Sequence, residues 1–221
     1  MIKKKYDGTT IFVVRHGESE SNVYARKHPD KPASHFGNLG SSLTQKGREQ
    51  AHLLAERFQN IPFSAVFSSD LNRAKETAEI IANKHNLPII TETTIRERFF
   101  GENMSAVKKR EIEKALDTLS EEQKFSFRYF KNGENLYDIV KRFKKFLSTV
   151  TKENLNKTII VITHGYVMRS FLIYEKYARY DELLGGSIKN AGYFVTQTDG
   201  KSFEIIEKHG ITRKNGVDDE E

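Results

Sequence analysis

The most informative absence in this 221-residue chain is cysteine, which does not occur at all. Its absence excludes disulfide bonds and thiolate chemistry. Long apolar stretches are also missing, since none approaches the roughly 20 residues that a membrane-spanning helix needs. The basic start at residues 1–6 leads into a polar turn and then an apolar strand, unlike a secretory signal. We therefore expect a cytoplasmic protein with no membrane association.

Charged side chains are abundant, and the 36 lysines and arginines outnumber the 30 aspartates and glutamates to give a net charge of +6. The lysines lie between glutamates, as in residues 108–114, a pattern typical of a solvated helix face. The sequence carries no signature of a nucleic-acid-binding module, so we expect no nucleic-acid partner. A small phosphorylated substrate accounts for the positive charge better than nucleic acid or a membrane surface does. Nothing in the sequence indicates an oligomeric state.

Apolar runs of strand length and helix length alternate along the chain. The predicted strands cover residues 10–14, 65–68, 87–91, 158–163, 191–198 and 203–208. The predicted helices cover residues 44–58, 71–85, 106–119, 136–155 and 166–174, with a loop at 27–42. This alternation predicts an α/β fold, a three-layer sandwich in which helices flank a mainly parallel sheet. One domain is expected over residues 1–221, with a small helical and aromatic cap at about 98–133 and a frayed acidic tail at 213–221.

Two of the predicted strands end in a histidine followed by glycine. His16 follows the first strand and is preceded by Arg15, and His164 follows the strand at 158–163. Arg73 comes shortly after another strand. Because ligands bind at the carboxyl ends of parallel strands, one crevice can gather these four side chains. Each histidine-glycine pair alone fits an ordinary strand-to-helix turn, but two pairs with arginines, whose planar guanidinium suits phosphate, indicate a phosphate-handling histidine pair.

Five segments of the chain resemble the histidine phosphatase superfamily, whose members include the cofactor-dependent phosphoglycerate mutases. The resemblance covers roughly residues 9–197 and follows the family's order and approximate spacing. The segments that carry it are residues 15–22, 43–51, 68–78, 95–101 and 163–165. Thr44, Gly47 and Gln50 match the family, and we expect them to begin and pack a helix.

The resemblance implies that His16 is the nucleophile and forms a phosphohistidine. Attack requires a neutral ring, and the neighbouring arginines lower the pKa of His16 in that direction. The expected catalytic residues are His16, Glu97, His164, Arg15 and Arg73. The expected phosphate- or substrate-binding residues are Arg15, Asn22, Arg73, Arg98, His164 and Gly165.

A carboxylic acid is needed to protonate the leaving oxygen, and the resemblance places this role on Glu97. Clustered phosphate charge raises the pKa of a nearby glutamate, which suits it to donate a proton near neutral pH. Glu18 is the rival because it adjoins the nucleophile, although the resemblance places it in the phosphate-loop scaffold. The alternative for Glu97 is a surface ion pair with a flanking arginine. Glu102 and Glu134 are weaker candidates, and Glu134 is expected to open a helix.

No metal is expected, because the chain shows no closely spaced set of histidine or carboxylate ligands and the arginines and histidines supply positive charge. No other cofactor is implied for a phosphatase. Three functions remain open: a phosphomonoesterase, a mutase that needs 2,3-bisphosphoglycerate, and a non-catalytic binder of phosphorylated ligands. The complete catalytic set argues against the binder, since binding alone needs no carboxylic acid.

The segment after Glu97 favours the phosphatase over the mutase. It is only about 35 residues long and lacks the longer insertion with which mutases enclose their substrate and exclude water. Arg98 and Lys108 lie where mutases place substrate-binding cations, which keeps the mutase open. The aromatic residues of this segment form either an apolar rim over the crevice or packing between helices; they are Phe99, Phe100, Phe125, Phe127, Tyr129 and Phe130.

Overall fold

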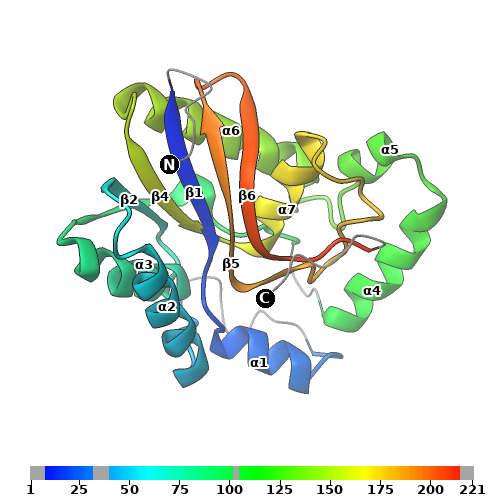
Figure 1. Ribbon diagram of the computed structural model, residues 1–221. Helices are drawn as coiled ribbons and strands as arrows, with labels where there is room; N and C mark the ends of the chain where they lie inside the picture. Colours follow the sequence, from blue (N-terminus) through cyan, green and yellow to red (C-terminus); the bar gives the residue numbers. More distant parts are fainter. Residues whose placement is uncertain (1–7, 32–39, 102–104, 215–221) are drawn as a thin grey trace.

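The computed structural model describes residues 8–31, 40–101 and 105–214, and in this part of the chain six strands form one sheet in the order β3-β2-β4-β1-β5-β6 (Figure 1). The strands are β1 (Thr9–Arg15), β2 (Phe63–Ser69), β3 (Ile89–Glu92), β4 (Thr158–Thr163), β5 (Ile188–Thr198) and β6 (Phe203–Ile211). The first four in sequence pair in parallel, while β5 runs antiparallel to β1 and β6 antiparallel to β5. The prediction of a mainly parallel sheet is confirmed.

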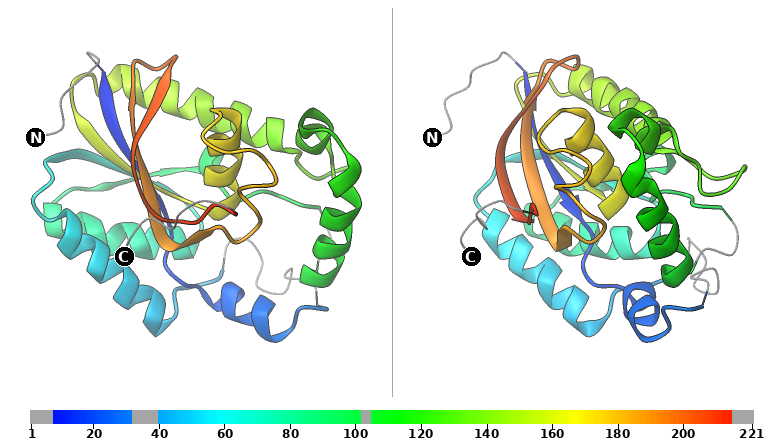
Figure 2. Two further views of the ribbon diagram at one scale, coloured as in Figure 1. Left: turned by 45° about the vertical axis from the view of Figure 1, so that its right-hand side comes forward. Right: turned by 90° about the vertical axis from the view of Figure 1, so that its right-hand side faces the viewer.

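Helices cover both faces of the sheet, which confirms the three-layer sandwich (Figure 2). They are α1 (Glu20–Lys27), α2 (Gln45–Phe58), α3 (Asn72–His85), α4 (Ala106–Ala115), α5 (Glu121–Ser126), α6 (Leu136–Glu153) and α7 (Gly165–Tyr174). Short 3₁₀ turns lie at Thr93–Ile95 and Leu116–Thr118. Helices α2 and α3 cover one face, and α6 and α7 cover the other.

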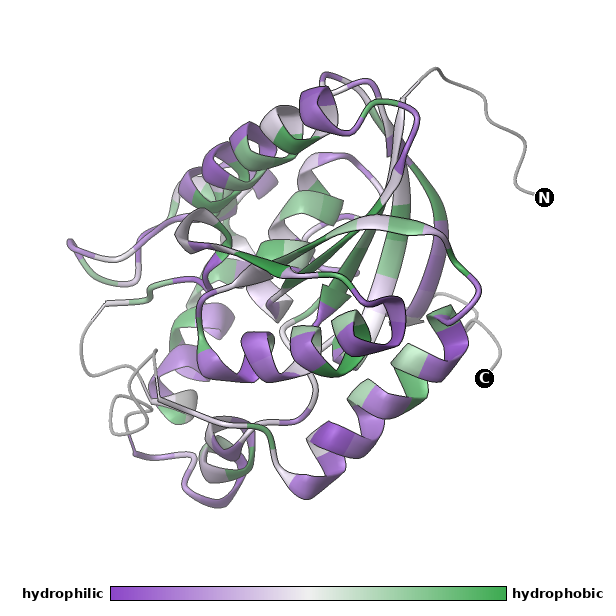
Figure 3. Ribbon diagram, turned by 90° about the vertical axis from the view of Figure 1, so that its left-hand side faces the viewer, coloured by the Kyte–Doolittle hydropathy of each residue, from purple (hydrophilic) through white to green (hydrophobic). Residues whose placement is uncertain are grey.

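The two cores meet across β1, whose side chains alternate between them. Ile11 and Val13 join the core under α6 and α7, whereas Phe12 and Val14 join the core under α2 and α3. All four side chains are buried. Burying each such side chain stabilises the fold by about 1.5–3 kcal/mol. Packing on both faces therefore holds β1 firmly in place, and with it the residues that follow the strand. In Figure 3 the hydrophobic ribbon lies mainly in the inner strands and the helix segments next to them, and the hydrophilic ribbon lies mainly on the outer sides of the helices.

Helix α6 begins at the predicted residue because local and tertiary signals agree there. Asn135 accepts a hydrogen bond from the backbone N–H of Asp138, and the Asp138 carboxylate accepts one in return from the N–H of Asn135. This reciprocal cap satisfies two donors at the helix start. Apolar side chains at helical spacing then fill the core: Leu136, Ile139, Val140, Phe143, Phe146, Leu147 and Val150.

Two helices differ from the sequence prediction. Helix α1 was not expected, because none of its residues is buried and it therefore has no apolar stripe; its sequence signal is the reciprocal cap between Ser19 and Asn22. The helix predicted over 106–119 ends at Ala115, and a separate helix, α5, begins after the Ser120 cap. Both α4 and α5 lie at the edge of the molecule away from α2 and α3 (Figure 1).

Some predictions concern residues outside the described ranges. Most of the predicted tail, residues 215–221, lies outside them, as do residues 1–7, Glu102 and residues 32–39 of the predicted loop. None of the helices in the described ranges combines the length and apolar character that a transmembrane segment requires.

Candidate active site

The two histidines lie side by side because their strands are neighbours. Strands β1 and β4 pair in parallel with Arg15 opposite Thr163, and the backbone N–H of His16 continues the pairing by donating to the Thr163 carbonyl over 3.1 Å. The imidazole rings of His16 and His164 follow directly, with centroids 5.1 Å apart and planes at 62°. Both side chains are buried. The structure thus brings the two predicted histidines together.

The position after His16 has room only for glycine, because the backbone of Gly47 approaches Gly17 closely. A Cβ atom at this position would collide with the carbonyl of Gly47 in α2, and a Cβ atom on Gly47 would collide with the carbonyl of Glu18. The predicted helix start is also present, since the Thr44 hydroxyl accepts a hydrogen bond from the N–H of Gly47 over 3.0 Å. The Gln50 side chain accepts the N–H of Glu18 over 2.8 Å. Helix α2 therefore packs directly on the segment after His16, and fixes it.

The hydrogen bonds of His16 select one neutral tautomer. Its Nδ1 lies 2.7 Å from the carbonyl oxygen of Gly17, which only accepts, so Nδ1 carries the proton. Its Nε2 accepts a hydrogen bond from Nε of Arg73 over 3.1 Å. The lone pair of His16 is consequently on Nε2, the nitrogen that faces the arginine.

Burial and charge keep this ring neutral. Burial lowers the pKa of His16 well below 6.5, and the positive charges of Arg73 and Arg15 lower it further. The hydrogen bond to Gly17 opposes this shift only in part. The ring is therefore a free base near neutral pH.

Arg73 is a buried cation and Arg15 a half-buried one, and a single carboxylate, that of Glu97, acts on both. Burial lowers the pKa of each guanidinium, and the charge of Glu97 acts in the opposite direction on both. Arg15 donates from Nη1 to the carbonyl of Ile188, and its guanidinium lies beside Gly165, the first residue of α7. Two arginines, a glutamate and the histidine pair thus share one site.

Two buried nitrogens in this site make no hydrogen bond within the described part of the chain: Nε of Arg15 and Nδ1 of His164. The other ring nitrogen of His164 lies 2.9 Å from the hydroxyl of Ser69, at the end of β2. Ser69 was not predicted as a site residue, although it stands at a strand end like the histidines. Buried polar atoms are nearly always hydrogen-bonded in proteins, so unpaired nitrogens beside two cations mark a place suited to an anion.

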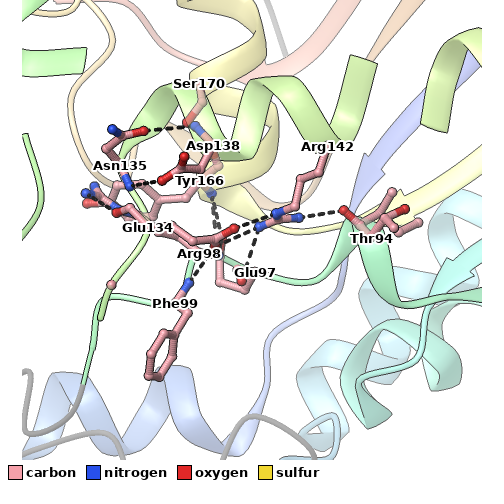
Figure 4. Close-up of polar contacts among 12 residues, drawn as sticks. Thr94, Glu97, Arg98, Phe99, Glu134, Asn135, Asp138, Arg142, Tyr166 and Ser170 are labelled. Atoms are coloured by element: carbon pink, nitrogen blue, oxygen red, sulfur yellow. Dashed lines mark hydrogen bonds and ion pairs between the residues drawn. The ribbon is translucent and has the colours of Figure 1, made fainter. Parts of the chain in front are cut away.

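The carboxylate of Glu97 is held at the start of α7 (Figure 4). Its Oε1 accepts the backbone N–H of Arg98 over 2.8 Å and that of Tyr166 over 3.2 Å. Tyr166 is in the first turn of α7, where backbone N–H groups have no partner within the helix and attract negative charge. The predicted alternative, a surface ion pair between Glu97 and a flanking arginine, is not found: Arg96 pairs with Asp70 instead.

Glu18, the rival acid, is engaged in the scaffold. Burial acts to raise the pKa of its carboxyl group, but hydrogen bonds from Arg26 and Thr44 outweigh burial and hold that pKa below its usual value. A carboxyl group whose pKa is held low is mostly ionised near neutral pH and has no proton to donate. Glu18 therefore belongs to the scaffold beside the nucleophile.

The remaining two predicted binding residues, Asn22 and Arg98, make contacts with residues other than the histidine pair. Asn22 uses its Oδ1 to accept from the N–H of Ser19 and from Asn190, whose amide also donates to the carbonyl of His16. Arg98 is buried, and its guanidinium donates to the carbonyl of Glu134 over 2.9 Å. It also stacks on three aromatic rings, those of Phe100, Tyr129 and Tyr166. The structure thus places the Arg98 side chain among aromatic residues.

Packing in the core, one of the two predicted arrangements, accounts for part of the aromatic segment. Phe125 is buried in the core, whereas Phe99 is 39% exposed. Phe100 packs edge-on against Tyr129 and Tyr166, with ring centroids 5.4 and 4.9 Å apart. This segment is therefore part core and part surface.

Lys109 is a charged residue near the site that the sequence did not single out. Its ammonium nitrogen lies 4.5 Å from the ring centroid of Tyr166 and 5.5 Å from that of Phe100. Burial lowers its pKa, and the charges of Glu113 and Glu97 raise it. It has no hydrogen bond or ion pair to another residue of the described ranges. Its lysine-rich helix α4 looked like a solvated face, and only the fold shows that one lysine packs against the rings of Tyr166 and Phe100.

No group of three or more histidine, aspartate or glutamate side chains in the described residues is arranged to hold a metal ion. The positive charge in the site comes from arginine side chains.

Comparison with known proteins agrees with this geometry. A family model described as histidine phosphatase superfamily (branch 1) matches residues 11–209. Phosphoserine phosphatase 1 of Hydrogenobacter thermophilus is 31% identical over 211 residues, which cover 94% of this chain and 89% of that protein.

Two proteins of Arabidopsis thaliana are also similar. Phosphoglycerate mutase-like protein 4 is 33% identical over 77% of this chain and 71% of its own, and metal-independent phosphoserine phosphatase is 30% identical over 78% and 71%. Among solved structures, phosphoglycerate mutase from Bacillus anthracis superposes with a TM-score of 0.72 at 22% identity, over 93% of this chain and 94% of that one. That likeness concerns the fold.

Proposed function

The chain belongs to the histidine phosphatase superfamily, and on that basis we propose that it is a metal-independent phosphomonoesterase acting on a small phosphorylated metabolite. Relatives named phosphoserine phosphatase support a phosphatase. The observation that carries the proposal is the neutral His16, whose Nε2 lone pair faces Arg73 beside a second, half-buried arginine and a second histidine.

In the first step, Nε2 of His16 attacks the phosphorus atom. A P–N bond forms while the bond to the leaving oxygen breaks. Arg73, Arg15 and His164 would hold the three remaining phosphoryl oxygens and neutralise the charge that develops on them. The unpaired nitrogens of Arg15 and His164 support this assignment, because each can donate a hydrogen bond to such an oxygen.

Glu97 would complete the first step by giving its proton to the departing alkoxide. In the second step a water molecule attacks phosphorus, Glu97 takes a proton from that water, and the P–N bond breaks to release inorganic phosphate. The same carboxyl group would thus act first as an acid and then as a base.

The second candidate is the bisphosphoglycerate-dependent mutase, which the mutase-like relative keeps open. Both reactions share the phosphohistidine and differ only in the acceptor that reaches it. The short segment after Glu97 favours water as that acceptor.

Following the reaction by ³¹P NMR separates the two functions. The protein is incubated with 3-phosphoglycerate, with and without 2,3-bisphosphoglycerate, beside phosphoserine, sugar phosphates and nucleotides. We expect inorganic phosphate from at least one compound and little primer-dependent 2-phosphoglycerate. Primer-dependent isomerisation without phosphate release would assign the mutase reaction instead.

A metal chelator should leave the activity intact. Hydrolysis of p-nitrophenyl phosphate is measured before and after dialysis against EDTA, and the two rates are expected to agree because arginines supply the positive charge. Restoration of a lost activity by Mg²⁺ or Zn²⁺ would contradict metal independence.

We further propose that Lys109 recognises the part of the substrate that is not transferred. A carboxylate or second phosphate near Tyr166 would find an ammonium group that has no ion pair within the described chain. Phosphoserine and phosphoglycerate each carry such a carboxylate.

Replacing Lys109 with methionine should therefore raise KM selectively. Loss of one charged hydrogen bond of about 1.5–3 kcal/mol predicts a KM at least tenfold higher for phosphoserine or 3-phosphoglycerate, whichever is the better substrate. The KM for p-nitrophenyl phosphate, which has no second anion, should rise much less. Lys114→Met is the matched control, since Lys114 is exposed on the same helix. Equal effects of the two substitutions would remove Lys109 from substrate recognition.

A further inference from the structure

The backbone that carries Glu97 lies outside every helix and strand. After the 3₁₀ turn at Thr93–Ile95, residues 96–101 make no regular ladder of hydrogen bonds. The orientation of the Glu97 carboxylate depends on this backbone, because it accepts the N–H of the next residue, Arg98. Some other part of the protein must hold the segment in place.

Arg142 makes the contacts that do so (Figure 4). Its Nη1 donates to the carbonyl of Thr94 over 2.7 Å, and its Nη2 lies 3.5 Å from the carbonyl of Glu97. Its Nε and Nη2 also bind both carboxylate oxygens of Glu134, at 2.7 and 3.1 Å. One planar guanidinium therefore spans the segment and a carboxylate at the same time.

Glu134 binds the segment on the C-terminal side of Glu97. Its Oε2 accepts the N–H of Phe99 over 2.9 Å, and its own backbone N–H donates to the Phe99 carbonyl over 2.7 Å. The sequence predicted that Glu134 opens a helix. The helix instead begins after the Asn135 cap, which leaves the Glu134 carboxylate directed at this segment.

The support behind these two residues is rigid. Arg142 is on α6, which is anchored in the core and capped at its start. The side chains of Arg142 and Glu134 are only 19% and 24% exposed, so their ion pair is better shielded than an ordinary surface pair. Their backbone contacts fall on residues 94, 97 and 99, on both sides of the candidate acid.

We infer that Arg142 and Glu134 are positioning residues, which together hold the carboxyl group of Glu97 where it can protonate the leaving oxygen. The inference rests on the proposed function, and it assigns these two residues a share in catalysis although neither is placed on the reacting atoms.

The test compares substrates that do and do not need the acid. Arg142→Met should lower kcat/KM for an alkyl phosphate such as glycerol phosphate by about 100-fold, the effect expected of a misplaced catalytic group. For p-nitrophenyl phosphate, whose leaving group needs no proton, the loss should be far smaller. That second rate also reports whether the variant has folded around an intact His16. In the background of Glu97→Gln, Arg142→Met should add little further loss on the alkyl phosphate.

Two more variants separate this role from others. Arg128→Met is the matched control, because Arg128 pairs with Asp138 near the start of α6 without touching residues 94–99. Arg142→Lys keeps the charge, which also acts on His164, but loses the planar fork. If the double variant Glu134→Gln/Arg142→Met folds better than Arg142→Met, the double variant takes the place of Arg142→Met in every comparison.

Hydrogen exchange provides a readout that does not depend on the chemistry of Glu97. Peptides covering residues 94–101 should exchange faster in Arg142→Met than in the wild type or in Arg128→Met. Unchanged exchange, equal slowing of both substrates, or full recovery by Arg142→Lys would overturn the positioning role. If Glu97→Gln itself shows no dependence on the leaving group, the proposed acid fails, and the exchange result alone then decides whether the pair orders the segment.

Discussion

Replacing His16 with alanine is expected to lower kcat/KM for p-nitrophenyl phosphate by at least about 10⁴-fold, because the pathway through the nucleophile disappears. The substitution removes the ring and its Nε2 lone pair and leaves the surrounding arginines. The backbone bonds of residue 16 to Thr163 and Ala191 do not involve the side chain, so the sheet should persist. Initial rates on purified protein provide the measurement, and circular dichroism checks the fold.

His52→Ala is the matched control for this experiment. His52 is exposed on α2, and its loss should not change the rate. Turnover near the wild-type level in His16→Ala would remove His16 from the nucleophilic role, whatever the identity of the substrate.

Replacing Glu97 with glutamine is expected to slow the hydrolysis of alkyl phosphates by about 10²–10⁴-fold, the usual contribution of a general acid. A nitrophenolate leaves without a proton, so p-nitrophenyl phosphate should lose much less. Glutamine retains an oxygen that can accept the N–H groups of Arg98 and Tyr166, which preserves the local backbone. The ratio of the two kcat/KM values isolates proton donation from general damage.

Glu18→Gln provides the comparison for this second prediction. Glu18 contacts Arg26 and Thr44 in the scaffold, so its replacement should affect both substrates alike. If Glu97→Gln slows both substrates equally while Glu18→Gln is selective, the acid role passes from Glu97 to Glu18.

The strand ends that build the site could be predicted from sequence because they depend on simple periodicity. Residues 10–14 and 158–163 are apolar and β-branched on both faces, which identifies buried parallel strands. Once two such strands are neighbours, His16 and His164 must emerge together. Helix α6 was predictable for a similar reason, since its apolar residues recur at helical spacing.

The rest of the site depends on contacts between segments that are distant in sequence. Lys109 of α4 is set apart by a contact with α7, where the Tyr166 ring centroid lies 4.5 Å from its ammonium nitrogen. Arg98 follows Glu97 in an irregular segment, where no periodicity fixes the direction of a side chain, and it points into the aromatic residues. Gly17 was expected to permit a turn, whereas the approach of Gly47 is what excludes a larger side chain.

The measurement that tests the central claim most directly is a rapid quench of the enzyme during turnover, followed by peptide mapping. The quench is made in alkali, in which a phosphorus–nitrogen bond survives. We predict a phosphoryl group on His16 that appears before inorganic phosphate and decays in water at a rate sufficient for steady-state turnover. Phosphate release without any phosphorylated His16, or a phosphohistidine that persists until a phosphoglycerate accepts its phosphoryl group, would contradict the account.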